Sequence, residues 1–326
     1  MIIEHQQEIL ISLVIPVYNT ERFLEKCFKS AIAQSFPNLE ILILNNGSTD
    51  NSQSIIDKYA TLDSRIVTYT IRHVETVKES KDNCYYRAKG DWIITLDSDD
   101  AIEEDYVKKL WERHIETNSD IVTGCMISVD LEGNAFDRLP VDGFGYDYVL
   151  DGKRAMSMTI DKWQFGLNGA LIKRDLFKNI YIDNANCLFF TDEIDSRLFL
   201  LGAKKVAFSK AEYYYTCNPS STGKKDSWNK YKYKLNTRLG LLSLTEEVFG
   251  KSSKEYNSVV YQSLGIVILA ERFFICKKKT ITDEQVKEFK SITKSILFSI
   301  DFKSLKMKAF VYLLISWFTK ALLHFV

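Results

Sequence analysis

Two carboxylates that stand one residue apart are the first candidates for chemistry in this sequence. Asp97 and Asp99 follow a short apolar run, in the order Asp97-Ser98-Asp99-Asp100. Carboxylate oxygens bind hard divalent cations such as Mn²⁺ or Mg²⁺, and such cations also bind phosphate oxygens. The alternative is structural, because an aspartate just before a helix is a common N-terminal cap. The pattern therefore indicates either a metal site or a helix cap at Asp99 or Asp100.

Other polar turns follow apolar runs in the same half of the chain. The polar residues concerned are Tyr18, Asn19, Asn45, Asn46, Ser48, Asp97 and Ser98. The runs before them, at residues 9–17, 39–44 and 92–96, are rich in Ile, Leu and Val, which is typical of strands buried on both faces. Segments with apolar residues at helical spacing alternate with these runs, which predicts a doubly wound, mostly parallel α/β sheet. Ligands of such sheets lie beyond the carboxyl ends of the strands, so we expect these turns to line one crevice.

The ordered combination of segments resembles the family 2 glycosyltransferases of the GT-A fold. The first segments that carry the resemblance are Pro16-Val17-Tyr18-Asn19, Asn45-Asn46-Gly47-Ser48-Thr49-Asp50, Ala88-Lys89-Gly90-Asp91-Trp92 and Asp97-Ser98-Asp99-Asp100. Downstream they are Asn168 to Arg174, Thr191-Asp192, Ala203-Lys204-Lys205, Tyr213-Tyr214-Tyr215 and Ser220-Ser221. The resemblance covers about residues 9–222, and the order of the pieces is more specific than any one of them.

The resemblance implies a GT-A sheet flanked by helices and an inverting transfer of a sugar from a nucleotide diphosphate, expected to be a UDP-sugar. Asp99 would be the main ligand of Mn²⁺ or Mg²⁺, assisted by Asp97. The implied donor-binding residues are Pro16, Val17, Tyr18, Asn19, Asn45, Asn46, Ser48, Lys81, Asp97 and Ser98. Asp192 would be the general base that takes the proton of the acceptor hydroxyl. The alternative for Asp192 is a solvated carboxylate favoured by the dipole of a helix N-terminus.

The implied domain organisation follows the same resemblance. We expect a catalytic domain at 1–223, with a nucleotide-binding half at about 9–120 and an acceptor half at about 121–223. The region at 224–326 reads as a helical extension. The acceptor would be a growing cell-surface glycan, such as capsule, O-antigen or exopolysaccharide, or a lipid-linked saccharide.

Two departures from the family pattern affect the donor site. Asn45 and Asn46 stand where the family usually has two aspartates, and an amide donates as well as accepts hydrogen bonds, so base recognition is expected to differ. Lys81 stands where the family usually has an arginine, and it offers a point charge without the bidentate fork. These changes leave open a second interpretation, a catalytically weakened protein that binds sugar nucleotides or serves as a scaffold.

Composition limits the partners and the compartment. Lys and Arg total 43, as do Asp and Glu, so the net charge does not favour nucleic acid as a partner. The six cysteines are scattered singly, which favours reduced thiols over a zinc site or a disulfide framework. The first apolar run lacks the basic flank and cleavage pattern of a secretory signal. We therefore expect the protein in the cytoplasm.

An apolar segment near the C-terminus suggests contact with a membrane. Residues 309–317 are strongly apolar, and Lys303, Lys306 and Lys308 precede them. A spanning helix needs ~20 apolar residues, so this segment fits a helix lying in the interface at the inner face of the cytoplasmic membrane. The alternative is a helix that packs on the protein or in a homodimer.

One rival enzyme class shares part of the pattern. The apolar strand followed by Asp97 and Asp99 also looks like the motif of haloacid-dehalogenase phosphatases, in which the first aspartate is the nucleophile. That motif normally opens its domain, whereas here several predicted strands come before it. The upstream turns therefore favour the glycosyltransferase interpretation.

Overall fold

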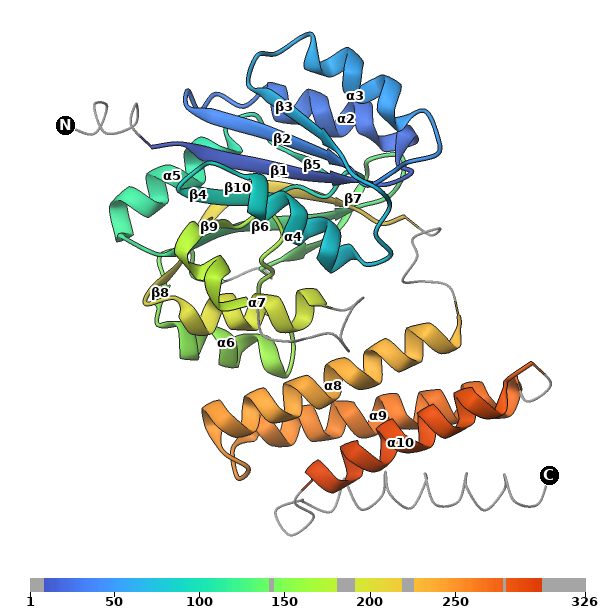
Figure 1. The fold of residues 1–326 in the computed structure, drawn as a ribbon. Coiled ribbons are helices and arrows are strands. Elements are labelled where there is room, and N and C mark those ends of the chain that lie inside the picture. The colour runs from blue at the N-terminus through green and yellow to red at the C-terminus, as the bar shows by residue number, and fades with distance from the viewer. Residues whose placement is uncertain (1–8, 141–143, 181–190, 219–225, 278–279, 301–326) are drawn as a thin grey trace. The chain divides into compact units, whose positions relative to one another are not determined.

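A computed structural model shows the fold of the chain (Figure 1). It describes residues 9–140, 144–180, 191–218, 226–277 and 280–300. The backbone contacts divide the chain into two compact units, the first comprising residues 1–182 and 196–219 and the second residues 183–195 and 220–326. The predicted boundary near residue 223 lies close to this division. Residues 183–195, which the sequence analysis assigned to the acceptor half, belong to the second unit.

The first unit is built on one mixed sheet. Its strands are β1 (Ile11–Val17), β2 (Leu39–Asn45), β3 (Ile66–Thr70), β4 (Trp92–Thr95), β5 (Ala101–Ile102), β6 (Ile121–Val129), β7 (Ala135–Leu139), β8 (Val149–Leu150), β9 (Leu171–Lys173) and β10 (Val206–Thr216). Within the described residues the order is β3-β2-β1-β4-β9-β6-β10-β5, with β7 beside β6 and β8 beside β10. Strands β1 to β4 are mutually parallel, and β9 is antiparallel to both β4 and β6. The carboxyl ends of β1, β2 and β4 therefore meet at one edge of the sheet.

Helices cover both faces of this sheet. They are α2 (Glu21–Ile32), α3 (Ser52–Ala60), α4 (Val77–Arg87), α5 (Tyr106–Thr117), α6 (Gly152–Ile160), η1 (Arg174–Ile180) and α7 (Thr191–Gly202). The buried stripes of α2 and α5 share one core with the alternate β1 residues Ile11, Leu13 and Ile15. Helix α4 packs on β1 and β2 from the other side, and Figure 1 shows it opposite α2 and α3. The predicted GT-A arrangement, a mostly parallel sheet between helices, is confirmed.

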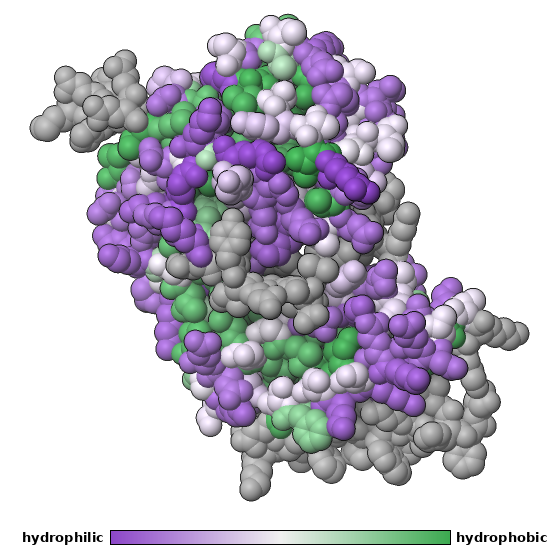
Figure 2. All heavy atoms as spheres, viewed as in Figure 1, coloured by the Kyte–Doolittle hydropathy of each residue, from purple (hydrophilic) through white to green (hydrophobic). Residues whose placement is uncertain are grey.

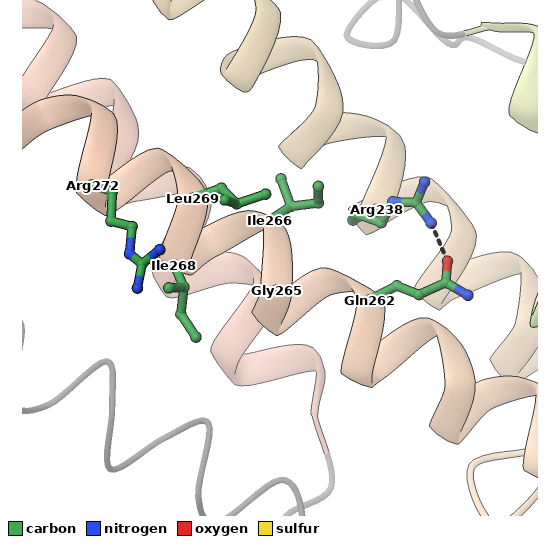
Figure 3. Close-up of a pocket in the computed structure, with 7 residues that line it drawn as sticks. All are labelled: Arg238, Gln262, Gly265, Ile266, Ile268, Leu269 and Arg272. Carbon is green, nitrogen blue, oxygen red and sulfur yellow. Dashed lines mark hydrogen bonds between the residues drawn. The ribbon is translucent and has the colours of Figure 1, made fainter.

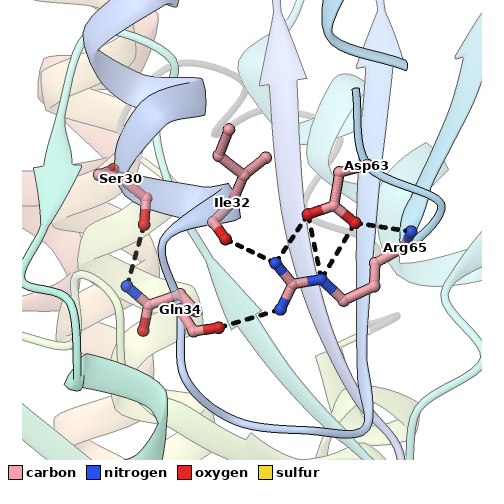
Figure 4. Close-up of polar contacts among 5 residues, drawn as sticks. All are labelled: Ser30, Ile32, Gln34, Asp63 and Arg65. Atoms are coloured by element: carbon pink, nitrogen blue, oxygen red, sulfur yellow. Dashed lines mark hydrogen bonds and ion pairs between the residues drawn. The ribbon is translucent and has the colours of Figure 1, made fainter. Parts of the chain in front are cut away.

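One arginine ties the end of α2 to the turn before β3 (Figure 4). The Arg65 guanidinium donates to the carbonyl oxygens of Ile32 at 2.6 Å and Gln34 at 3.0 Å. It also pairs with Asp63, with Nη2 2.7 Å from Oδ2, and this contact lowers the pKa of that carboxyl. The last carbonyl groups of a helix have no partner within the helix, so Arg65 closes this end of α2.

The Tyr213-Tyr214-Tyr215 run belongs to a single long strand. β10 begins at Val206 and continues through all three tyrosines to Thr216. Its pairing with β6 shifts register between Phe208 and Glu212, which marks a bulge or irregularity. Alternation places Tyr213 and Tyr215 on the same face of the strand, where Tyr213 is buried and Tyr215, near the end of the strand, is exposed.

The described part of the second unit is mainly helical, as the sequence predicted. Its three long helices are α8 (Trp228–Phe249), α9 (Lys254–Cys276) and α10 (Asp283–Ser299). Each helix begins at a serine or threonine that accepts a hydrogen bond from a backbone N–H, namely Ser227, Ser253 and Thr282. Trp228 packs edge-on against Phe274 and Phe289 and joins the three helices. The unit is therefore held by capped helices around an aromatic core.

A groove lies between α8 and α9 (Figure 3). Its volume is about 520 Å³, and its lining residues are Arg238, Gln262, Gly265, Ile266, Ile268, Leu269 and Arg272. Arg238 donates to Gln262 Oε1 at 2.6 Å, and the Leu269 side chain is exposed. In Figure 2 the visible surface of these helices is hydrophilic with hydrophobic patches between.

The structure describes only some of the residues on which the predictions about membrane contact and thiols depend. The apolar segment 309–317 and Cys187 lie outside the described residues. Within the described ranges, α9 is the one helix whose length and composition would allow it to cross a membrane, and half of its apolar window is buried in the protein. Such a helix is weak support for a membrane span. The described cysteines are free thiols, and Cys27, Cys84 and Cys125 are buried.

Candidate active site

Hydrogen bonds join the three polar turns at the carboxyl edge of the sheet. Asn19 donates its backbone N–H to Ser48 Oγ at 3.1 Å, and its Oδ1 accepts from Thr49 N at 2.8 Å. Thr20 Oγ1 donates to Ser98 Oγ at 3.0 Å. The structure therefore brings together the turns after β1, β2 and β4, as the parallel sheet predicted.

The start of α2 in this crevice already has a partner. Asp50 Oδ2 accepts the backbone N–H of Glu21 at 3.1 Å, and Glu21 Oε2 accepts that of Asn51 at 2.8 Å. Thr20 is the N-cap residue of α2, yet its side chain makes no cap hydrogen bond. The expected cap at this position is supplied instead by an aspartate from the next turn, which locks the N-termini of α2 and α3 together.

The two asparagines that depart from the family pattern are buried and bonded within the protein. Asn45 Oδ1 accepts from Ser48 N at 2.9 Å, and its amide donates to Gln53 Oε1 at 2.6 Å. Asn46 exchanges two hydrogen bonds with the backbone of Val74, at 2.7 and 2.9 Å. These amides therefore shape the turn after β2 and hold the segment after β3 against it.

That segment contributes a residue that the sequence analysis missed. His73 stacks on Tyr18 with ring centroids 4.2 Å apart and an interplanar angle of 16°. Its Nδ1 lies 3.1 Å from the carbonyl oxygen of Asn46. Gly47 has a φ of +66°, and a Cβ there would lie 2.8 Å from His73 N, so the close approach needs glycine. No motif marks His73 in the sequence, because the loop at 71–76 has no periodic pattern.

The acidic turn after β4 gathers three carboxylates with different surroundings. Burial, followed by the charge of Asp97, raises the pKa of Asp99 to about 6. Burial and both neighbours also raise the pKa of Asp100. Carboxylates that are held close together and away from water resist ionisation, and a divalent cation between them would offset this repulsion.

Both carboxylate oxygens of Asp100 accept hydrogen bonds from within the protein. Tyr213 donates its hydroxyl to Oδ2 at 2.6 Å, and Thr216 donates its backbone N–H to Oδ1 at 2.7 Å. The same hydroxyl accepts the N–H of Asp97 at 3.3 Å. The alternative of a helix cap at Asp99 or Asp100 is wrong, because β5 intervenes and the N-cap residue of α5 is Asp105. Asp100 therefore anchors the turn to β10 and leaves Asp97 and Asp99 as the candidate ligands.

Lys81 lies at this turn, as its predicted role requires. From α4 its Nζ lies 3.3 Å from Asp97 Oδ1, with the lysine side chain 13% exposed and the aspartate 29%. A partly buried ion pair of this kind is screened less than one on the surface. The structure thus joins a phosphate-binding candidate directly to a metal-binding candidate.

The carboxylates of this turn fit a metal ion that is shared with substrate phosphates. They do not form a complete cage of protein ligands. Within the described ranges, no group of three or more His, Cys, Asp or Glu side chains could hold a metal ion. Asp97 and Asp99 offer hard oxygen ligands beside a crevice, and Mg²⁺ is commonly bound by one or two carboxylates together with substrate phosphates. The pair fits that mode of binding.

The expected general base lies at the start of α7. Asp192 is the second residue of this helix, and its side chain lies outside the described part of the structure. The next residue, Glu193, forms a two-oxygen ion pair with Arg238 of α8, with Nη2 2.8 Å from Oε1 and 2.7 Å from Oε2. Within the second unit, this pair fixes the first turn of α7 to α8. The role of Asp192 stays a prediction.

Comparison with known proteins decides the family. The model for glycosyl transferase family 2 matches residues 12–198. The chain belongs to this family. Family membership makes the protein a glycosyltransferase and excludes the alternative of a haloacid-dehalogenase phosphatase.

Curated relatives and solved structures agree with the family. The chain is 26% identical over 274 residues to the glycosyltransferase GlyG of Streptococcus pneumoniae, covering 81% of this chain and 85% of the relative. It is 27% identical over 270 residues to a cholesterol galactosyltransferase of Borreliella burgdorferi, covering 77% and 72%. Residues 1–349 of S. aureus TarS in complex with UDP-GlcNAc share the fold, with a TM-score of 0.55 at 14% identity over 90% of this chain and 93% of that one.

Proposed function

We propose that this enzyme moves a sugar from a UDP-sugar to a growing cell-surface glycan with inversion at the anomeric carbon. The observation that carries the proposal is the hydrogen-bonded meeting of three turns beside Asp97 and Asp99 in a family 2 chain. TarS, which shares the fold, has been solved with UDP-GlcNAc, and this supports a UDP-sugar as the donor. We place the enzyme in the cytoplasm, at or near the inner face of the membrane.

Different residues of the crevice bind the nucleoside and the diphosphate of the donor. The turns at Pro16 to Asn19 and Asn45 to Ser48 hold the nucleoside, with the half-exposed ring of Tyr18 as the stacking surface. Lys81 and Ser98 lie beside the acidic turn and orient the diphosphate. Hydrogen bonds between and within the turns hold them in place before the donor arrives, which lowers the entropy cost of reaching a reactive geometry.

Asp97 and Asp99 would hold Mn²⁺ or Mg²⁺ through their carboxylate oxygens. The ion, when bound, neutralises the negative charge that develops on the departing nucleoside diphosphate. Asp192 takes the proton of the acceptor hydroxyl as its oxygen attacks the anomeric carbon from the face opposite the nucleotide. The ion pair between Glu193 and Arg238 fixes the helical turn that carries this base.

Turnover and donor binding are measured separately to test the proposal. Thermal shifts across UDP-, GDP- and TDP-sugars with Mn²⁺ identify the donor, because a ligand that binds the native state raises its melting temperature. Asp99→Asn is expected to lower Mn²⁺-dependent turnover by about 10²-fold or more. Asp105→Asn, the control, changes the next aspartate after the acidic turn, whose carboxylate accepts a hydrogen bond from Ser35. Native turnover in Asp99→Asn would refute the role of this turn.

Separate experiments test the general base and the stereochemistry of the transfer. Asp192→Asn is expected to retain the donor-induced thermal shift and to lose transfer by about 10²- to 10⁴-fold. Transfer at the native rate in this variant would show that another group takes the proton. NMR of the product is expected to show the anomer opposite to that of the donor, and retention would refute an inverting mechanism. Donor binding without turnover on any glycan or lipid-linked acceptor would favour the scaffold interpretation.

A further inference from the structure

The ion pair between α4 and the acidic turn places a fixed positive charge where a metal ligand is expected. Lys81 Nζ lies 3.3 Å from Asp97 Oδ1, and only 13% of the lysine side chain is exposed. Lys81 stands three residues before Cys84, a buried residue of α4, and from this helix its ammonium reaches the turn after β4. The Lys81 ammonium thus offsets the charge of Asp97.

A divalent cation at Asp97 must compete with this ammonium. The two cations repel each other at short range, and the repulsion is strong where side chains are partly removed from water. Asp100 accepts hydrogen bonds on both carboxylate oxygens, from Tyr213 and from Thr216, which leaves Asp97 and Asp99 as candidate ligands. The carboxylate that Lys81 holds is therefore one of the two that are left to bind a metal ion.

A nucleoside diphosphate would offer the ammonium a second partner. Lysine is a compact point charge with three donors on a flexible stem, so it can turn from a carboxylate to a phosphate without a fork geometry to match. When Lys81 moves to the diphosphate, Asp97 gains a free oxygen at the same moment that phosphate oxygens become available as further ligands. Metal and donor would then each favour the binding of the other.

We propose that Lys81 is an internal counter-ion that occupies Asp97 until the donor diphosphate displaces it, so that the metal binds strongly only together with the donor. This inference rests on the proposed function, because it takes Asp97 and Asp99 as the ligands. Its consequence is a thermodynamic coupling: the factor by which UDP raises the affinity for Mn²⁺ equals the factor by which Mn²⁺ raises the affinity for UDP. Lys81 is the source of a large part of that factor.

The chain offers a matched control one turn earlier on the same helix. Lys78 pairs with Asp82 at 3.2 Å, and the two side chains are 12% and 29% exposed. The exposures of Lys81 and Asp97 are 13% and 29%, so Lys78→Gln removes the same charge from a pair of the same type. Unlike Lys81→Gln, it leaves Asp97 paired with Lys81.

The test measures Mn²⁺ binding to the full chain from the loss of the free-ion electron paramagnetic resonance signal, with and without UDP. Lys81→Gln is expected to bind Mn²⁺ alone about tenfold more tightly than the native protein, a change of about 1.4 kcal/mol. UDP should then raise its Mn²⁺ affinity by a smaller factor than in the native protein. Lys81→Arg, which keeps the charge, should bind Mn²⁺ alone no more tightly than the native protein does, and Lys78→Gln should behave as the native protein does.

Three results would overturn the inference, and they differ in what else they affect. If Lys81→Gln binds Mn²⁺ alone no more tightly than the native protein, Lys81 does not compete with the metal, and the proposed function is untouched. If the native protein binds no Mn²⁺ even with saturating UDP, the inference fails together with the metal-dependent part of the proposed function. Equal effects of Lys78→Gln and Lys81→Gln would also overturn it, since they would reflect net charge alone.

Discussion

Removing the Tyr213 hydroxyl would test how firmly the acidic turn is anchored to β10. In the native protein this oxygen donates to Asp100 Oδ2 at 2.6 Å and accepts from Asp97 N at 3.3 Å. Asp100 is 1% exposed, so water cannot replace the lost donor. In Tyr213→Phe the carboxylate keeps the Thr216 N–H, which lies 2.7 Å from Oδ1.

The expected loss follows from the kind of acceptor. Burial raises the pKa of Asp100, and the Tyr213 hydroxyl acts against this shift because it donates to the ionised carboxylate. A hydrogen bond to such a charged group contributes about 1.5–3 kcal/mol to stability, whereas one to a neutral group contributes about 0.5–1.5 kcal/mol. Tyr106 supplies the matched control, since it is equally buried, packs edge-on against Tyr213, and donates to the neutral carbonyl oxygen of Gly169 at 3.0 Å. Tyr213→Phe should therefore cost about 1 kcal/mol more than Tyr106→Phe.

Urea denaturation followed by circular dichroism gives both free energies of unfolding. Metal-dependent turnover gives a second readout, because loosening the acidic turn should lower turnover in Tyr213→Phe and leave it near the native value in Tyr106→Phe. Equal losses of stability in the two variants would refute the argument that Asp100 is anchored as a charged acceptor. Native turnover in Tyr213→Phe would show that the turn holds its shape without this bond.

Two further predictions concern the close approach at Gly47 and the half-buried ring of His114. Gly47→Ala should weaken UDP binding, measured by calorimetric titration, whereas Gly133→Ala should not. Both glycines have a positive φ, but only the Cβ added at residue 47 meets a neighbour within 4 Å. Equal UDP affinities of the two variants would contradict this prediction. Burial lowers the pKa of His114, so the unfolded chain takes up the proton first. The free energy of unfolding should thus fall as the pH drops below about 6.5, until the ring also titrates in the folded protein. Urea denaturation at pH 7.5 and 5.5 should show a smaller fall in His114→Gln, and a fall as large as in the native protein would count against the argument.

The parallel half of the fold was predictable because its signals are local. Each buried strand is a continuous apolar run, each following helix shows helical spacing, and polar turns separate them, so the edge where the turns meet follows from the connectivity. The contact between Thr20 and Ser98 needed no further information than this order. The same reasoning failed for the helix cap, since the two-residue strand β5 between Asp100 and α5 leaves no periodic pattern.

The partners of the site residues were not predictable, because they come from distant parts of the chain. Tyr213 and Asp100 are 113 residues apart in sequence, and only the antiparallel pairing of β10 with β5 brings them together. His73 lies in an irregular loop, where neither spacing nor composition marks a residue. The two asparagines showed a departure from the family pattern, but the protein groups that use their amides became visible only once β3 and the loop after it were placed.

The anchoring of Asp100 also limits how this enzyme can be recombined with its relatives. The acidic turn and the end of β10 share one hydroxyl and one backbone N–H, so the two segments form a single inherited part although the chain separates them widely. A chimera that takes residues 97–100 from one parent should take residues 213–216 from the same parent. A crossover between these segments would combine the carboxylate at position 100 of one parent with the end of β10 of the other parent.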